Sequence, residues 1–69
     1  MYRVDYYTLA VCQDGTVGNV RQYSDVWYTD QEIEVIPKEL QRVVNIIKGA
    51  DKYVSVIQSI NKIEGHLSR

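Results

Sequence analysis

The sequence predicts a small α+β fold, in which one helix packs on one face of an antiparallel β-sheet. Two runs rich in tyrosine and β-branched residues flank an Asp-Gly pair, a pattern typical of a β-hairpin. A later run carries apolar residues at helical spacing between a proline and a glycine. We expect the order β-β-(β)-α-β in a single domain over 1–64, followed by a flexible tail at 65–69.

The first predicted strand covers 2–12, YRVDYYTLAVC, which holds no glycine or proline. Alternate residues of a strand point to opposite faces of the sheet. One face would hold Tyr7, Leu9 and Val11, and the other Tyr2, Val4, Tyr6 and Ala10. Because both faces are partly apolar, we expect a central strand or one that is covered on both sides.

The hairpin turn is predicted at Asp14-Gly15, since a type I′ turn needs positive φ at both central positions. Gly18-Asn19 is the alternative place for the turn, or for a bulge in the returning strand. The return strand is expected at 20–28. Its alternation puts a charged and aromatic set on one half-solvated face: Arg21, Tyr23, Asp25 and Trp27.

The segment after the return strand has two interpretations. Thr29 and Glu32 fit a capping box, which would start a short helix. Residues 32–35 nevertheless alternate like a strand, and Ile36 precedes Pro37, which favours extended geometry. We expect a loop followed by a short extended segment at 32–36.

A helix is predicted at 37–48. Pro37 suits the first helical position, Glu39 suits the first turn, and Gly49 stands where a left-handed C-cap is expected. We expect the strands to be met by a stripe at i, i+3, i+4 and i+7, formed by Leu40, Val43, Val44 and Ile47.

Residues 53–60, YVSVIQSI, are rich in β-branched residues and alternate in part, so we predict a final strand. The alternative is a second helix within 53–64, because the isoleucines of this region and Leu67 also fit helical spacing.

A chain of 69 residues has a thin core, and such chains often add disulfides, a metal or a partner subunit. Cys12 is the only cysteine and His66 the only histidine, so an internal disulfide is impossible and a metal site is not expected. Self-association, for example as a homodimer, is therefore an expectation. The lone cysteine favours a reducing compartment, and no apolar run approaches the roughly 18 residues of a membrane span. We expect a cytoplasmic protein without membrane contact.

The net charge of −1 is divided unevenly along the chain. Residues 1–36 carry a net charge of −4 and residues 37–69 a net charge of +3. The two halves would attract each other within one fold or between two copies. The alternative is two faces for two kinds of partner.

No catalytic arrangement is recognisable in the sequence. A Cys12–His66 dyad would need the C-terminal tail to dock. Paired carboxylates are available at 25–34, but acid–base catalysis needs an enclosure that separates their pKa values. Spacings typical of metal or phosphate sites are absent. We expect a protein that is not an enzyme and that holds no cofactor or metal.

The segment 25–34 is the first candidate binding surface. It holds the only tryptophan beside a tyrosine, among four acidic residues. Tryptophan and tyrosine are frequent interface anchors, and the acids would steer a protein partner with a basic surface. The alternative is that Trp27 closes the core and the acids keep a sheet edge solvated. The candidate partner-binding residues are Tyr23, Asp25, Trp27, Tyr28, Asp30, Glu32 and Glu34.

Nucleic-acid binding is the alternative function, although the acidic balance of the chain makes it the weaker one. With Asn45 included, polar and basic residues recur along the predicted helix at three- or four-residue steps. Basic groups release counterions from a phosphate backbone. Glu39 and Asp51 dilute this stripe. The candidate residues are Lys38, Arg42, Lys48 and Lys52.

In size, in its acidic and aromatic composition and in its lack of catalytic equipment, the chain resembles small accessory proteins of phages and mobile elements, including inhibitors of host defence such as anti-CRISPR proteins. The resemblance is one of type, so it covers no motif and transfers no residue role. The function expected from the sequence is a non-enzymatic protein-binding or inhibitor module acting on a host protein.

Overall fold

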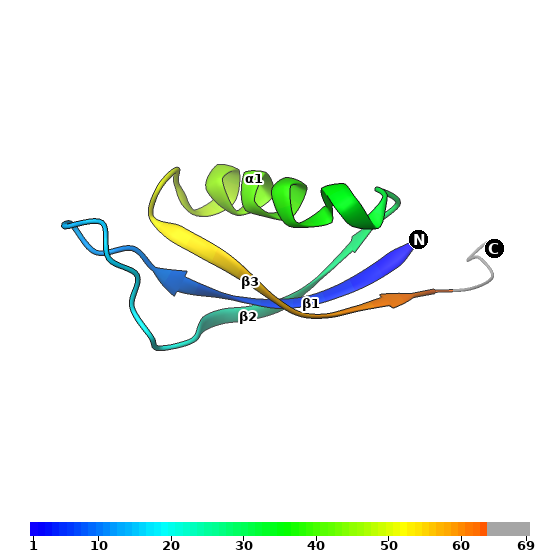
Figure 1. The fold of residues 1–69 in the computed structure, drawn as a ribbon, viewed down its shortest axis with the longest axis horizontal. Helices are drawn as coiled ribbons and strands as arrows, with labels where there is room; N and C mark the ends of the chain where they lie inside the picture. Colours follow the sequence, from blue (N-terminus) through cyan, green and yellow to red (C-terminus); the bar gives the residue numbers. More distant parts are fainter. Residues whose placement is uncertain (64–69) are drawn as a thin grey trace.

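The computed structural model describes residues 1–63 and confirms a small α+β fold (Figure 1). Its strands form one antiparallel sheet in the order β2-β1-β3, so β1 is the central strand. The predicted tail at 65–69 lies outside the described residues. The elements are β1 (Tyr2–Ala10), β2 (Gln22–Thr29), the 3-10 turn η1 (Ile33–Val35), α1 (Ile36–Lys48) and β3 (Tyr53–Lys62).

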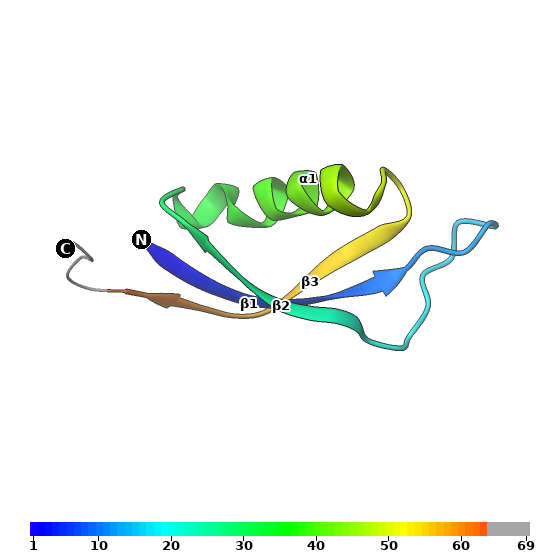
Figure 2. The same cartoon turned by 180° about the vertical axis from the view of Figure 1, so that it is seen from behind.

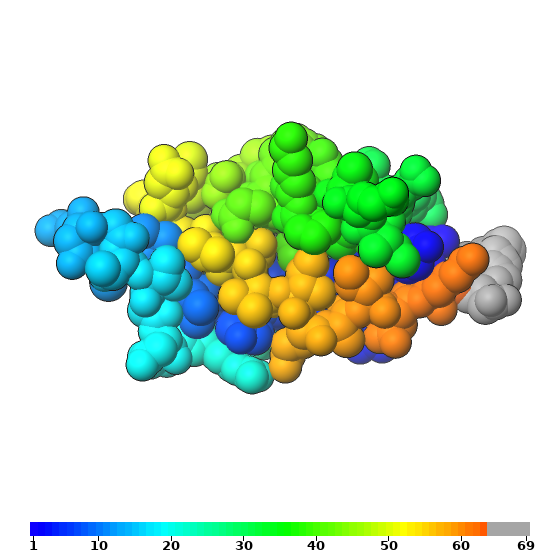
Figure 3. Space-filling model, viewed as in Figure 1, coloured from blue at the N-terminus to red at the C-terminus, as the bar shows by residue number. Residues whose placement is uncertain are grey.

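A hairpin joins β1 to β2 and extends as an arm beyond the C-terminal end of α1 (Figures 1 and 3). The Gly15 N–H donates to the Cys12 carbonyl (2.9 Å), and the Cys12 N–H donates to the Thr16 carbonyl (2.7 Å). Gly15 alone of the turn residues has positive φ, at 88°. The turn is therefore at the predicted Asp14-Gly15 but is not type I′, because a three-residue loop places only its last residue in the left-handed region.

A bulge near the start of β2 changes which side chains share a face. Tyr6 pairs with Asp25, whereas Thr8 pairs with Gln22, so β2 holds one extra residue there. Tyr23 lies within this bulge and has a φ of 57°, which is uncommon for residues other than glycine. The predicted alternation is wrong across this bulge, because Gln22 joins the face of Asp25.

The face predicted as half-solvated is the one that α1 covers. Trp27 pairs with Val4, which is fully buried beneath the helix. Asp25 and Tyr23 lie on this same side, whereas the Arg21 guanidinium lies over the Tyr7 ring on the opposite face, 4.4 Å from its centroid. The prediction that these four residues share one half-solvated face is therefore wrong, because Arg21 lies on the other side of the sheet from the rest.

The extended segment predicted at 32–36 is wrong, since 33–35 form a 3-10 turn that runs directly into α1. Ile36 adopts helical angles (φ −56°, ψ −47°) although it precedes Pro37, a position that normally disfavours them. Its side chain is completely buried in the core. The burial of a large aliphatic side chain outweighs the local preference, because it contributes about 1.5–3 kcal/mol.

The core lies between α1 and the sheet. Val4 of β1 meets Ile36, Leu40 and Val44 of α1, which are spaced at i, i+4 and i+8. The predicted stripe is only partly right, because Ile47 is 67% exposed. Aromatic and aliphatic side chains of all three strands pack around this cluster: Tyr2, Tyr6, Trp27, Tyr53, Ile57 and Ile60.

The final strand is confirmed, and its partner is β1 rather than β2. Gln41 of α1 ties its first half to the helix. The Gln41 Nε2 donates to the Tyr53 carbonyl (2.9 Å), and Oε1 accepts from the Ser55 backbone N–H (2.8 Å). Figures 1 and 2 show the result, with α1 along one side of the sheet and no described helix or strand over the other.

Candidate protein-binding surfaces

The two neighbouring aromatic residues of the predicted binding segment point to opposite faces of β2. Trp27 is half-buried on the helix side and packs against the core cluster. Tyr28 pairs with Arg3 on the helix-free side and is 54% exposed. They do not form one surface, so Tyr28 is the freer of the two for contact with a partner.

Tyr23 forms an aromatic cluster at the C-terminal end of α1. Its ring meets that of Tyr53 edge-on, with the centroids 5.3 Å apart. The Lys48 Nζ lies 3.9 Å from the centroid of Tyr23, a cation–π contact. Interaction with the Tyr23 hydroxyl, and then burial, raise the pKa of Tyr53. The cluster ties β2 and β3 to the end of the helix.

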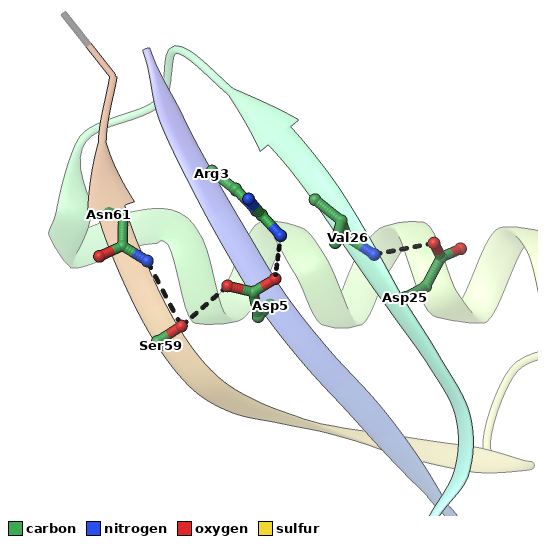
Figure 4. Close-up of polar contacts among 6 residues, drawn as sticks. All are labelled: Arg3, Asp5, Asp25, Val26, Ser59 and Asn61. Atoms are coloured by element: carbon green, nitrogen blue, oxygen red, sulfur yellow. Dashed lines mark hydrogen bonds and ion pairs between the residues drawn. The ribbon is translucent and has the colours of Figure 1, made fainter.

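Asp25 accepts a hydrogen bond at the edge of the sheet and also affects the pKa of a neighbouring tyrosine. Its Oδ1 accepts a hydrogen bond from the Val26 N–H at 2.8 Å (Figure 4). Burial, followed by the charge of Asp25, raises the pKa of Tyr6, the register partner of Asp25 on β1. Asp25 lies within β2, whereas the other candidate acids follow the end of that strand.

Asp30, Glu32 and Glu34 lie together around a shallow hollow at the start of η1, here called the acidic hollow. Tyr2 and Ile33 line it as well. The Thr29 hydroxyl oxygen accepts from the Gln31 N–H (3.1 Å), which shapes the turn. The structure thus gathers three of the predicted acids at one place, beside an exposed isoleucine.

The basic residues of the alternative site do not form one stripe. Lys48 is turned toward the sheet over Tyr23, and Lys52 lies in the turn after the helix with its side chain against Gly49. Arg42 forms an ion pair with Glu39 at 3.0 Å on the solvent side of α1. Lys38, one turn before Arg42, is the remaining exposed basic residue of the helix among those predicted.

An apolar flank of α1, which sequence reasoning missed, is exposed near its C-terminal end. Val43, Ile46 and Ile47 form this helix flank, and Ile46 is 69% exposed. Consecutive helical residues are about 100° apart, so Ile46 and Ile47 cannot both face the sheet. That spacing was the signal available in the sequence for Ile46, whereas the exposure of Ile47 had no local signal.

The second missed surface is the side of the sheet without a helix, here called the open face. The register places side chains of β1, β2 and β3 together on it. Its apolar part consists of the half-buried Tyr7, Leu9, Val26, Val54 and Val56 and the exposed Tyr28. The signal was the double-sided apolar pattern of the first strand.

A polar network occupies the other end of the open face (Figure 4). The Arg3 guanidinium lies 3.3 Å from the Asp5 carboxylate. The Ser59 hydroxyl donates to Asp5 Oδ2 (2.9 Å), and Asn61 Nδ2 lies 3.5 Å from the Ser59 oxygen. The charges at this end are therefore paired within the face.

Within residues 1–63, no cluster of histidine, cysteine or acidic side chains has the geometry to hold a metal ion. Cys12 is a free, exposed thiol in the hairpin arm. His66, its partner in the dyad considered from the sequence, lies outside the described residues. Among residues 1–63, the helical elements fall short of the length and apolar character that a membrane-spanning helix needs.

Known protein families, curated proteins and solved structures were compared with this chain, and none of them matches it.

Proposed function

We propose that this chain is a non-enzymatic protein-binding module whose partner contacts the helix side of the molecule. The observation that carries the proposal is the exposure of Ile46 and Ile47, at 69% and 67%, on one flank of the only α-helix described. A small domain that leaves two adjacent isoleucines in water loses the stabilisation that their burial would give. Contiguous exposed apolar surface marks interaction sites in folded proteins.

The charges on the helix side suggest the chemistry of the partner. The acidic hollow lies at the N-terminal end of the η1–α1 segment, and the helix flank lies near its C-terminal end. A partner with a basic patch beside an apolar one would meet both. Rim charges of this kind act mainly on the association rate and on the choice of partner.

Inhibition by occupying the surface of a host protein is the mode of action that we propose for such a module. It needs a binding surface and no catalytic group. The exposed thiol of Cys12 suits a reducing compartment, so the cytoplasm is the proposed location.

The test is affinity capture from nuclease-treated lysate of the source cells with the double variant Ile46→Lys/Ile47→Lys. We expect the bound protein to fall at least about tenfold, equivalent to about 1.4 kcal/mol. Val20→Lys is the matched control, because Val20 is 66% exposed and lies in the hairpin arm, away from the helix flank.

The same capture, repeated without nuclease, separates the nucleic-acid alternative. Added lysines would strengthen a contact with phosphate, so binding that rises in the double variant and disappears with nuclease would contradict the proposal. Binding abolished by Lys38→Glu/Arg42→Glu but kept by the double lysine variant would favour the basic residues of the helix.

A further inference from the structure

The open face carries more apolar side chains than is usual for a sheet face in contact with water. An antiparallel sheet with one wet face normally alternates between apolar and polar residues. Here Tyr7 and Leu9 of β1 lie beside Val54 and Val56 of β3, opposite the face that α1 covers. The strands have the composition of a sheet that is covered on both sides, and the described chain covers one.

Side chains bind outward-pointing backbone groups of both edge strands. A further partner is therefore expected on the face of the sheet rather than along its edges. The Val11 N–H donates to the Lys52 carbonyl (2.9 Å), so the backbone of Tyr53 and Ser55, in the alternating register, points away from β1. Gln41 binds both of these outward groups.

On the other edge the backbone of Val26 points outward by the same alternation, and the Asp25 carboxylate takes its N–H. Side chains that occupy edge groups oppose pairing with a strand of another chain.

We propose that a second copy of this chain covers the open face, so that two three-stranded sheets pack as a sandwich. In a dimer with a twofold axis every contact occurs twice: if residue i of one copy meets residue j of the other, residue j of the first also meets residue i of the second. The adjacent Arg3 and Asp5 are complementary to themselves under that symmetry, because each Arg3 can face the Asp5 of the other copy.

The charge of the open face argues against the basic partner proposed above. Arg3 and Arg21 stand against Asp5 on this face, and the three acids of the acidic hollow lie elsewhere. The face therefore carries no excess of negative charge that would select a basic protein. The inference does not rest on the proposed function, since it uses the opposite side of the molecule.

The size of the open face sets the expected strength. The 9 residues of β1 span about 30 Å and three strands about 14 Å, which gives roughly 400 Å² per copy in flat projection. Stable interfaces bury about 800 Å² per partner. The pair is thus a reversible dimer with an expected Kd in the micromolar range, rather than a permanent complex.

Sedimentation velocity of the purified full chain from about 1 to about 200 µM, which brackets a micromolar Kd, tests the proposal. We expect the wild type to shift from monomer to dimer across this range. Val56→Lys, which places like charges in the apolar part of the open face, should raise the Kd at least tenfold. Ile46→Lys is the matched control on the helix flank and should leave the Kd within about twofold.

Tyr28→Lys guards against a folding defect, because Tyr28 is 54% exposed and its replacement leaves the core intact. It should weaken the dimer as well, with an unchanged circular dichroism spectrum. A wild type that is monomeric at every concentration overturns the proposal. So does a dimer that survives both open-face variants, or one that only Ile46→Lys disrupts.

Discussion

At the scale of single residues, Gln41 joins the helix to the edge of the sheet. Its amide donates to the Tyr53 carbonyl and accepts from the Ser55 N–H, in the way that a neighbouring strand would. Because these bonds are partly buried, a variant without the amide leaves two strand groups to find water or no partner at all.

We therefore expect Gln41→Ala to lower the free energy of unfolding by about 1–2 kcal/mol. Gln58→Ala is the control, because Gln58 is an exposed glutamine of β3, the strand that Gln41 contacts, and it should change stability by less than about 0.5 kcal/mol. Urea denaturation of both variants measures the difference. Equal effects would show that the Gln41 contacts contribute nothing specific.

Tyr6 gives the fold a dependence on alkaline pH. Burial, followed by the charge of Asp25, raises the pKa of its phenol. Folding favours the protonated phenol, so this contribution is fully present below the ordinary pKa of about 10 and is lost as the pH rises through the raised value. Between pH 8 and pH 11 the wild type should lose more stability than Tyr6→Phe. Parallel unfolding curves at the two pH values would refute the assignment.

At the scale of elements, the start of α1 shows core burial overriding local preference. Ile36 precedes Pro37 and yet is helical, because its side chain fills the space above Val4. The sequence pattern identified the helix and its glycine C-cap, since those signals are local. It misplaced the apolar stripe by choosing Ile47 over Ile36, because the position of the sheet under the helix is not a local property.

The two isoleucines at the ends of the helix provide the test of this correction. Ile36→Ala should cost about 2–5 kcal/mol of unfolding free energy, as expected for a fully buried side chain. Ile47→Ala should change stability by less than about 0.5 kcal/mol, because Ile47 is mostly exposed. Thermal or urea unfolding decides between them, and a larger cost at Ile47 would restore the stripe inferred from periodicity.

The bulge of β2 is a second feature that depends on contacts distant in sequence, so the sequence did not predict it. Two strands and an Asp-Gly turn were readable from composition and turn chemistry. The left-handed Tyr23 was not, because its φ is sustained by contacts with Tyr53 and Lys48, which are distant in sequence. As a result, the faces of β2 were assigned incorrectly across the bulge.

At the scale of the whole molecule, the sheet separates two apolar surfaces. The helix flank lies on one side and the open face on the other. The candidate residues from the sequence divide between the two sides of the sheet, since Tyr23, Asp25 and Trp27 lie on the helix side and Tyr28 lies on the open face. A contiguous segment such as 25–34 was a poor guide to a surface, because neighbours in a strand face opposite ways.

The central claim is that these two surfaces take different partners. The direct measurement is one capture experiment in nuclease-treated lysate containing a second, differently tagged copy of the chain. We predict that Ile46→Lys/Ile47→Lys loses the foreign protein and keeps the second copy, whereas Val56→Lys loses the second copy and keeps the foreign protein. Loss of both partners with the same variant, while that variant remains folded, would contradict the claim.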